Sequence, residues 1–268
     1  MRIRQAARAA DDGYRSGLVP GIKLADDARR LADELAFASG RLSALATEPP
    51  GLYAEVASGP DVEEALWLAM LIACLGPLEE EDPFATIRAI RVPWSAGVLP
   101  SLEDAAVGPR GAGDAAGLAR TLAAYRSWAE RAGSQAAGYA GEPRWTPQRR
   151  FERAFERLGL PGLPRAARFD LLVTLSWLGR VDAQPDSLHV LDDQASVAAK
   201  RVFGIGDPLL IDRRARELAT AAEVPLAALD LALHNWGRPP DAPRVTLGVG
   251  APTPDAASRE RARAALEA

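Results

Sequence analysis

One stretch of the chain, residues 202–219, gathers side chains that could do chemistry. Its letters GIGDP (204–208) form a glycine turn with an acid, and Asp212 follows close to several arginines. A carboxylate beside the apolar face of a helix can stabilise a developing cation or orient a nucleophile such as water or an amine. Backbone amides at a glycine turn can hold an anion. The stretch therefore predicts either a site for an anionic ligand or only the start of a helix.

A purely structural interpretation of the same stretch is available. The two glycines would end one helix by adopting positive φ, and Asp207 would cap the next helix in front of a proline. Asp212 would then pair with Arg216 one turn later. A dinucleotide fingerprint is excluded because its third glycine is missing, and a Walker loop is excluded because the chain has no Gly-Lys-Ser/Thr. We take Asp207 as the structural cap and Asp212 as the functional acid.

A second glycine-containing turn, LGLPGLP (158–164), lies between two predicted helices. Such a corner directs backbone amides outward, where they can hold a phosphate. Residues 144–168 contain seven arginines and two glutamates, and residues 198–216 contain five basic and two acidic side chains. This clustering favours an anion-binding face. Acidic and basic residues also interleave at helical spacing, so an ordinary solvated helix surface is the alternative.

The order of these features resembles the helix-hairpin-helix DNA glycosylase superfamily. The matching features are the Leu-Pro-Gly turn (160–162), the helix after it, and Ile211-Asp212 followed by arginines. In that family the hairpin grips DNA phosphate, and an aspartate at the start of a later helix carries the chemistry. The resemblance covers roughly residues 60–237, with its motif residues within 151–237. It implies an all-α fold of two helical lobes with a cleft, and monofunctional cleavage or modification at a flipped base.

The chain departs from that family pattern in three places. The second glycine of the hairpin is absent, and the spacing from hairpin to acid is lengthened around PDSLHV (185–190). The helix after the hairpin has no early lysine, which disfavours lyase chemistry through a Schiff base. The segments AAKRVFGIGDPLLIDRRARELA (198–219) and ALDLALHNWG (228–237) are similar to the divergent α-glutamyl/putrescinyl thymine pyrophosphorylases, which are proposed to attach an amine to an activated pyrimidine in DNA.

The resemblance assigns roles to individual residues. Asp212 is the expected catalytic acid. The expected DNA contacts are the hairpin glycine and nearby basic side chains: Gly162, Arg165, Arg168, Lys200, Arg213 and Arg214. The expected base-pocket residues are Trp177, Asn235 and Trp236, although such tryptophans are more often part of a core. The competing hypothesis is a non-catalytic helical module that binds another protein.

Composition limits the remaining classes. The net charge of −4 gives no global support to a nucleic-acid partner, so a DNA partner depends on the local arginine clusters. Cys74 is the only cysteine, and the two histidines lack metal-ligand spacing, so neither a metal nor a cofactor is expected. The apolar run at 66–78 is shorter than the ~20 residues of a membrane span. We expect a cytoplasmic protein without a membrane segment.

Helical periodicity dominates the elements that must position these residues. Helices are predicted over 23–47, 62–75, 115–135, 147–158, 165–178, 193–202 and 225–236. Asp61 and Glu64 predict a capping box at the second of these helices. Residues 97–116 predict an exposed loop, and VTLGV (245–249) is the only strand-like piece. We expect one helical domain over 1–237, with the hairpin and acid in 151–237. A Pro-rich connection and a loose charged tail are expected over 238–268.

Overall fold

The computed structural model describes residues 11–250 and 256–267. Every regular element in these two ranges is helical, which confirms the all-α class. The helices up to the hairpin are α1 (Ala25–Thr47), α2 (Leu52–Ser58), α3 (Val62–Leu75), α4 (Ala85–Ile90), the 3-10 turn η1 (Trp94–Ala96), α5 (Ala115–Ala132), α6 (Gln135–Ala140) and α7 (Pro147–Arg157). The later helices are α8 (Arg165–Trp177), α9 (Gln194–Phe203), α10 (Pro208–Ala221), α11 (Leu226–Trp236) and α12 (Ala256–Glu267).

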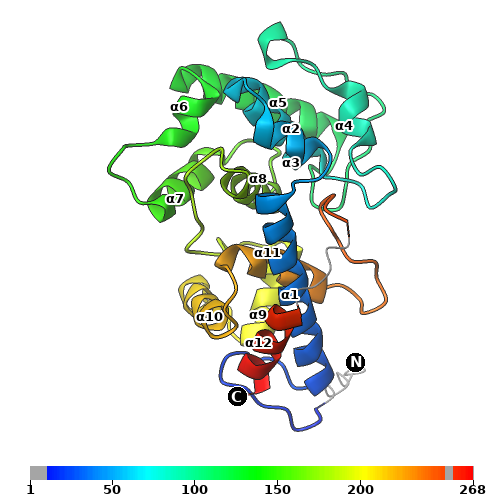
Figure 1. Cartoon of the computed structure of the whole chain (residues 1–268), viewed down its shortest axis with the longest axis vertical. Helices are drawn as coiled ribbons and strands as arrows, with labels where there is room; N and C mark the ends of the chain where they lie inside the picture. Colours follow the sequence, from blue (N-terminus) through cyan, green and yellow to red (C-terminus); the bar gives the residue numbers. More distant parts are fainter. Residues whose placement is uncertain (1–10, 251–255, 268) are drawn as a thin grey trace, which may run out of the picture.

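The helices form two groups that share the long helix α1 (Figure 1). In one group, α1 packs along α11 and α12, and α9 packs on α11. In the other group, α3 packs on α8 and α6, and α5 packs on α6. Helix α1 also contacts α8, so it links the group of the last helices to the group around α3. Helix α8 therefore stands where the two groups meet, and α7 packs on α8.

Helix α3 is the centre of its group, as its all-round apolar sequence predicts. Its residues from 65 to 75 are buried. Asp61 accepts hydrogen bonds from the amides of Glu63 (2.9 Å) and Glu64 (3.2 Å), which confirms the predicted cap. The Glu64 carboxylate, however, accepts from the Trp94 amide (2.7 Å) and from the Ser95 amide. Glu64 therefore binds η1 and not the Asp61 amide that a capping box would require. Among the described residues no helix, α3 included, has the length and apolarity to cross a membrane.

The segment 97–116 is held against the core over its second half, so the expectation of an exposed loop is wrong there. The Gly108 amide donates to Leu75 O (2.7 Å) and the Ala112 amide donates to Cys74 O (2.6 Å). A Cβ on Gly111 would lie 2.4 Å from Leu75 O, so only glycine fits this close approach. The attachment buries Arg110, which is 3% exposed. Sequence pattern missed it because the acceptors are carbonyls at the end of α3.

The segment after α11 is also packed, which corrects the expectation of a loose tail. The Asn235 side chain forms two hydrogen bonds with the backbone of Val245. Its Nδ2 donates to the Val245 carbonyl (3.1 Å), and its Oδ1 accepts from the Val245 amide (3.0 Å). Tyr53 donates to Leu247 O (2.8 Å). Leu247 has φ 53°, so residues 245–249 turn instead of forming the predicted strand. Beyond the undescribed residues 251–255, α12 packs on α1 and α10.

Candidate functional site

The hairpin corner between α7 and α8 rests on α5. The Leu163 amide donates to Leu160 O (3.1 Å), and Gly162 takes φ 80° inside this turn. A Cβ on Gly162 would lie 2.7 Å from Gly117 O, so the position requires glycine for both conformation and space. Thr121 Oγ1 donates to Pro161 O (2.9 Å) and fixes the corner to α5. Gly162 itself is exposed, so the corner lies at the surface.

Helix α8 starts directly after this corner without a side-chain cap. Pro164 occupies the N-cap position and offers no side-chain acceptor. The amides of residues 165–167 have no acceptor among the described residues. Unpaired amides at a helix start carry partial positive charge and bind anions. These amides are the backbone donors at the predicted phosphate contact, and the three residues that carry them are buried.

A carboxylate at the start of a helix does lie beside the hairpin, but it belongs to Asp193. Asp193 caps α9 by accepting from the Ser196 amide (2.9 Å). Its Oδ2 accepts from Nε of Arg165, the first residue of α8, at 2.6 Å. The Asp193 side chain is 22% exposed, so it is neither sealed nor fully solvated. The sequence contains the signal for it: an apolar stretch ends at Leu191, and the acid and the helix follow.

Arg165 is buried, which contradicts the prediction that it contacts DNA phosphate. Its side chain is 2% exposed and lies between two carboxylates, Asp193 and Asp230. Its Nη1 donates to Leu188 O (2.6 Å). Burial alone would lower the pKa of this guanidinium, but the carboxylates outweigh burial and raise its pKa above the usual value. A buried charge needs such partners, and the burial of the guanidinium keeps it out of reach of a phosphate at the surface.

The ionic contacts continue from Arg165 into the junction of the two helix groups. Asp230 also accepts from Arg110, whose Nε and Nη2 bind both oxygens of Asp170 at 2.6 and 2.9 Å. The side chains of Arg110 and Asp230 are 1% and 2% exposed. Burial would raise the pKa of Asp230, but Arg165 and Arg110 hold it below its usual range. The ionic chain, defined as Asp193–Arg165–Asp230–Arg110–Asp170, thus connects α9, α8, α11 and the 97–114 segment.

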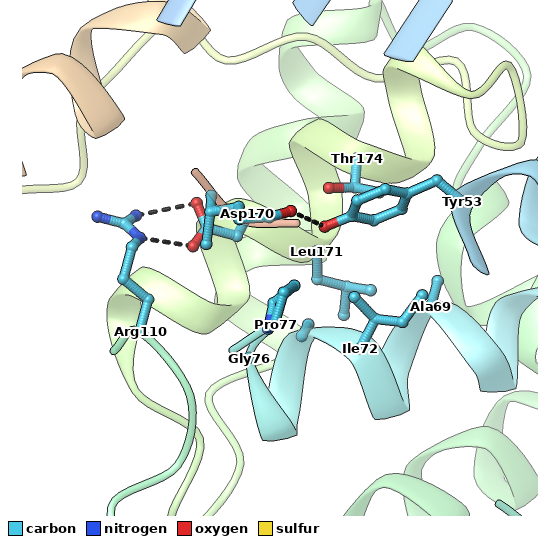
Figure 2. A pocket seen from close by; sticks show the side chains of 11 residues that line it. Tyr53, Ala69, Ile72, Gly76, Pro77, Arg110, Asp170, Leu171 and Thr174 are labelled. Carbon is cyan, nitrogen blue, oxygen red and sulfur yellow. Dashed lines mark hydrogen bonds and ion pairs between the residues drawn. The ribbon is translucent and has the colours of Figure 1, made fainter. Parts of the chain in front are cut away.

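A small recess adjoins the end of the ionic chain (Figure 2). Figure 2 shows the Arg110 guanidinium against Asp170 at the side of the recess, with Tyr53 and Thr174 across it. The cavity has about 10 Å³, which is room for one water molecule. A nucleobase does not fit this space.

Asp212 is not at the start of a helix, so that part of its predicted role is wrong. Helix α10 begins at Pro208 and is capped by Asp207, which accepts from the Leu210 amide (3.1 Å) and has the structural role expected of it. Asp212 instead accepts from Ser187 Oγ (2.7 Å) and the Leu188 amide (2.9 Å). It holds the loop at 185–190, where the chain departs from the family spacing. Arg216, the partner expected for Asp212, donates to the carbonyl of Asp186 (2.7 Å).

The same loop is stacked against the hairpin through His189. This residue has φ 49°, a left-handed conformation that costs energy for a side chain other than glycine. Its ring lies 4.0 Å from the Phe155 ring at an interplanar angle of 15°. Arg168 lies over the Phe155 ring at 4.4 Å and donates to Phe155 O (3.2 Å). Burial lowers the pKa of His189 below its usual value. Arg168, a predicted DNA contact, is thus half-buried in a stack that joins loop and hairpin.

The remaining predicted DNA contacts lie on α9 and α10, outside the hairpin. Lys200 Nζ donates to Leu191 O (3.1 Å). Arg213 and Arg214 both pair with Glu217, each at 3.0 Å. Arg213 is the more exposed of the two arginines, with 73% of its side chain accessible. Exposed pairs of this kind contribute little to stability and can exchange partners.

Two of the three predicted base-pocket residues are built into the core, which contradicts their predicted role. Trp236 is 3% exposed, and its Nε1 donates to Asp27 O (2.9 Å). Asn235 is 7% exposed, and its side-chain amide is hydrogen-bonded to the backbone of Val245. Trp177, the third residue, is half-buried at the last position of α8. Nearby His234 is 8% exposed, and burial together with Arg110 lowers its pKa to about 3.

Comparisons with known proteins add no relative. No family model matches the chain, and no curated protein or solved structure is significantly similar to it. Within residues 11–250 and 256–267, no group of three or more His, Cys, Asp or Glu side chains is arranged to hold a metal ion.

Proposed function

We propose that the chain is a DNA-base-processing enzyme of helix-hairpin-helix type, and that Asp193 is its acid in place of Asp212. One observation carries the proposal: the Arg165–Asp193 pair, at 2.6 Å, holds a helix-start carboxylate beside the first turn of the hairpin's second helix. The uncapped amides of α8 are then the phosphate contact, and Asp193 is the group that acts on the nucleotide. The proposal keeps the expected cytoplasmic setting, where a lone thiol stays reduced.

The chemistry follows from the charge on Asp193. An ionised carboxylate can stabilise positive charge that develops on the sugar carbon as the base departs, or it can orient an incoming water or amine. Extracting the base from its stack costs a few kcal/mol. Because the recess at Asp170 has only about 10 Å³, the proposed reaction requires the two helix groups to separate or the 185–190 loop to move.

Two products are compatible with this chemistry. Attack by water at the sugar carbon releases the base and leaves an abasic site, whereas attack by an amine on an activated pyrimidine displaces the activating group and leaves a base that carries the amine. Helix α8 contains no lysine, so a Schiff-base strand cleavage is not part of the proposal. Mass spectrometry of an oligonucleotide after reaction distinguishes the two products, because the first carries a hydroxyl group in place of the base and the second carries the amine in place of the activating group.

The test compares two neighbouring aspartates. Asp193→Asn should lower product formation on a panel of modified-base oligonucleotides by at least ~100-fold and spare DNA binding, since the carboxylate acts on the reaction and asparagine still caps a helix. Asp192→Asn is the matched control, because Asp192 is exposed and precedes the cap. Duplex affinity should fall steeply between 50 and 200 mM salt if several phosphates are contacted. Equal activity of Asp193→Asn and wild type would remove Asp193 from the mechanism.

One observation favours the non-catalytic alternative. Leu209 and Leu210, at the start of α10, are 79% and 50% exposed, which is unusual for adjacent leucines in a chain that has no partner. If wild-type protein fails to bind duplex or single-stranded DNA at low salt, a protein partner at α10 becomes the better function. In that case Leu209→Lys, and not Asp193→Asn, should disrupt the partner complex.

A further inference from the structure

A recess separate from the hairpin lies among α3, α6 and α7. Its volume is about 450 Å³, within the ~300–1,000 Å³ of small-molecule pockets. Its wall is mainly apolar and includes Leu66 of α3, Tyr139 and Ala140 of α6, and Val181 after α8. Leu66 and Tyr139 are 1% and 2% exposed, so the floor is a fixed part of the core. An apolar group placed there would lose water contact on several sides.

The rim of the recess is electropositive. Arg150 and Arg180 line it, and Asp182 is the only acid there. Arg180 is held rigidly, because it donates to the carbonyls of Val56 (2.6 Å) and Ala57 (2.7 Å) at the end of α2. Arg150 pairs with Asp182, but the two side chains are 16% and 71% exposed. The Arg150 guanidinium also donates to the carbonyls of Asp182 and Pro143, each at 3.3 Å. The exposed Asp182 carboxylate can turn into water at little cost, and the guanidinium then keeps N–H groups for another carboxylate.

The recess is not the site proposed above. Arg150 belongs to the first turn of α7, and Arg180 follows the last turn of α8. The hairpin corner and Asp193 lie at the opposite ends of these helices. Because α8 has 13 residues, the two sites are about 20 Å apart along it.

We propose that this recess binds a small apolar carboxylate, with the carboxylate on Arg150 and the apolar body on Leu66 and Tyr139. Guanidinium and carboxylate match in a two-donor, two-acceptor geometry, and the apolar floor matches an aryl or alkyl group. A neutral analogue keeps only the apolar contact, and a cationic analogue meets the arginine rim. The expected order of affinity is therefore carboxylate, then alcohol, then amine.

The test uses 2-naphthoate, 2-naphthylmethanol and 2-naphthylmethylamine with the full chain, by calorimetry and by protein chemical shifts. Arg150→Met should weaken naphthoate binding about tenfold or more, because a charge-assisted contact is lost while the aliphatic stem stays. Arg149→Met is its control, since Arg149 is the adjacent residue and lies outside the recess. Ala140→Trp should fill the recess and abolish binding. Ala137→Trp, also at an exposed position of α6, should not.

The proposal is overturned if naphthoate shows no saturable binding, if the alcohol binds equally well, or if Ala140→Trp binds like Ala137→Trp. If a melting curve shows that Ala140→Trp is unfolded, the comparison of Arg150→Met with Arg149→Met still tests the proposal. Equal affinities of these two variants for naphthoate would refute the carboxylate contact. None of these measurements involves DNA, so the result is independent of the proposed enzyme activity.

Discussion

Removing the charge of Asp230 tests the ionic chain most directly. Asp230 accepts from Arg165 and from Arg110, and all three side chains are at most 2% exposed. In Asp230→Asn the shape is kept, but the new amide directs N–H groups at one of the two guanidinium groups. Taking one partner from a buried pair costs ~3–5 kcal/mol, because the remaining charge is left uncompensated. Arg165 keeps Asp193 and Arg110 keeps Asp170, so we expect the lower half of that range.

The assays are urea unfolding and thermal melting, both followed by tryptophan fluorescence. For domains of 150–250 residues, each kcal/mol shifts the melting temperature by about 2–4 °C, so a loss of roughly 3 kcal/mol lowers it by about 6–12 °C. The matched control is Asp26→Asn, because Asp26 pairs with Arg29 at the surface and its side chain is 89% exposed. The control should change stability by less than ~1 kcal/mol. A loss below ~1 kcal/mol in Asp230→Asn would show that the ionic chain does not hold the helix groups together.

Three further predictions concern pH, the hairpin and Asp212. The pKa of His234 is about 3 and that of His189 is also lowered, chiefly by burial, so the fold favours the neutral rings. The contribution of the neutral histidines to the free energy of unfolding should therefore be fully present above pH 6.5 and be lost as pH drops toward 3. In urea midpoints measured across this range, His234→Gln should make the decline with falling pH less steep. Gly162→Ala should cost about 1–3 kcal/mol, because φ is 80° and the new methyl group meets Gly117 O. Gly133→Ala, with φ 89° and open space, should cost less in the same unfolding assay, and equal losses would contradict the packing of the corner on α5. Asp212→Asn should lower the urea midpoint by weakening the hold on the 185–190 loop, yet leave DNA product formation near the wild-type rate; a wild-type midpoint with lost activity would restore Asp212 as the acid.

Much of the fold was readable from local pattern, because each cap and its amide are a few residues apart. Asp61 and Asp207 cap α3 and α10 as predicted. The apolar run of α3 predicted its central place. These features depend on backbone geometry over one or two helical turns, which a single sequence contains in full.

The candidate site could not be read in that way, since its contacts join residues far apart in the chain. Arg165 looks like a surface cation beside a turn, but its partner Asp230 lies 65 residues later. Asp212 has the sequence neighbours expected of a helix-start acid. Its hydrogen-bond donors, however, are the Ser187 hydroxyl and the Leu188 amide, 25 and 24 residues earlier in the chain. The pattern of an apolar stretch followed by an acid occurs at both Asp193 and Asp212, so local sequence does not separate the two.

The amino-acid sequence by itself therefore determined most helices, several of their caps and the turn between α7 and α8, because these depend on neighbours in the chain. Only the tertiary structure decided which charges are buried together and which carboxylate stands beside the hairpin. The physical reason is that burying a charge demands a partner, and the packing of α8, α9 and α11 selects that partner from the whole chain.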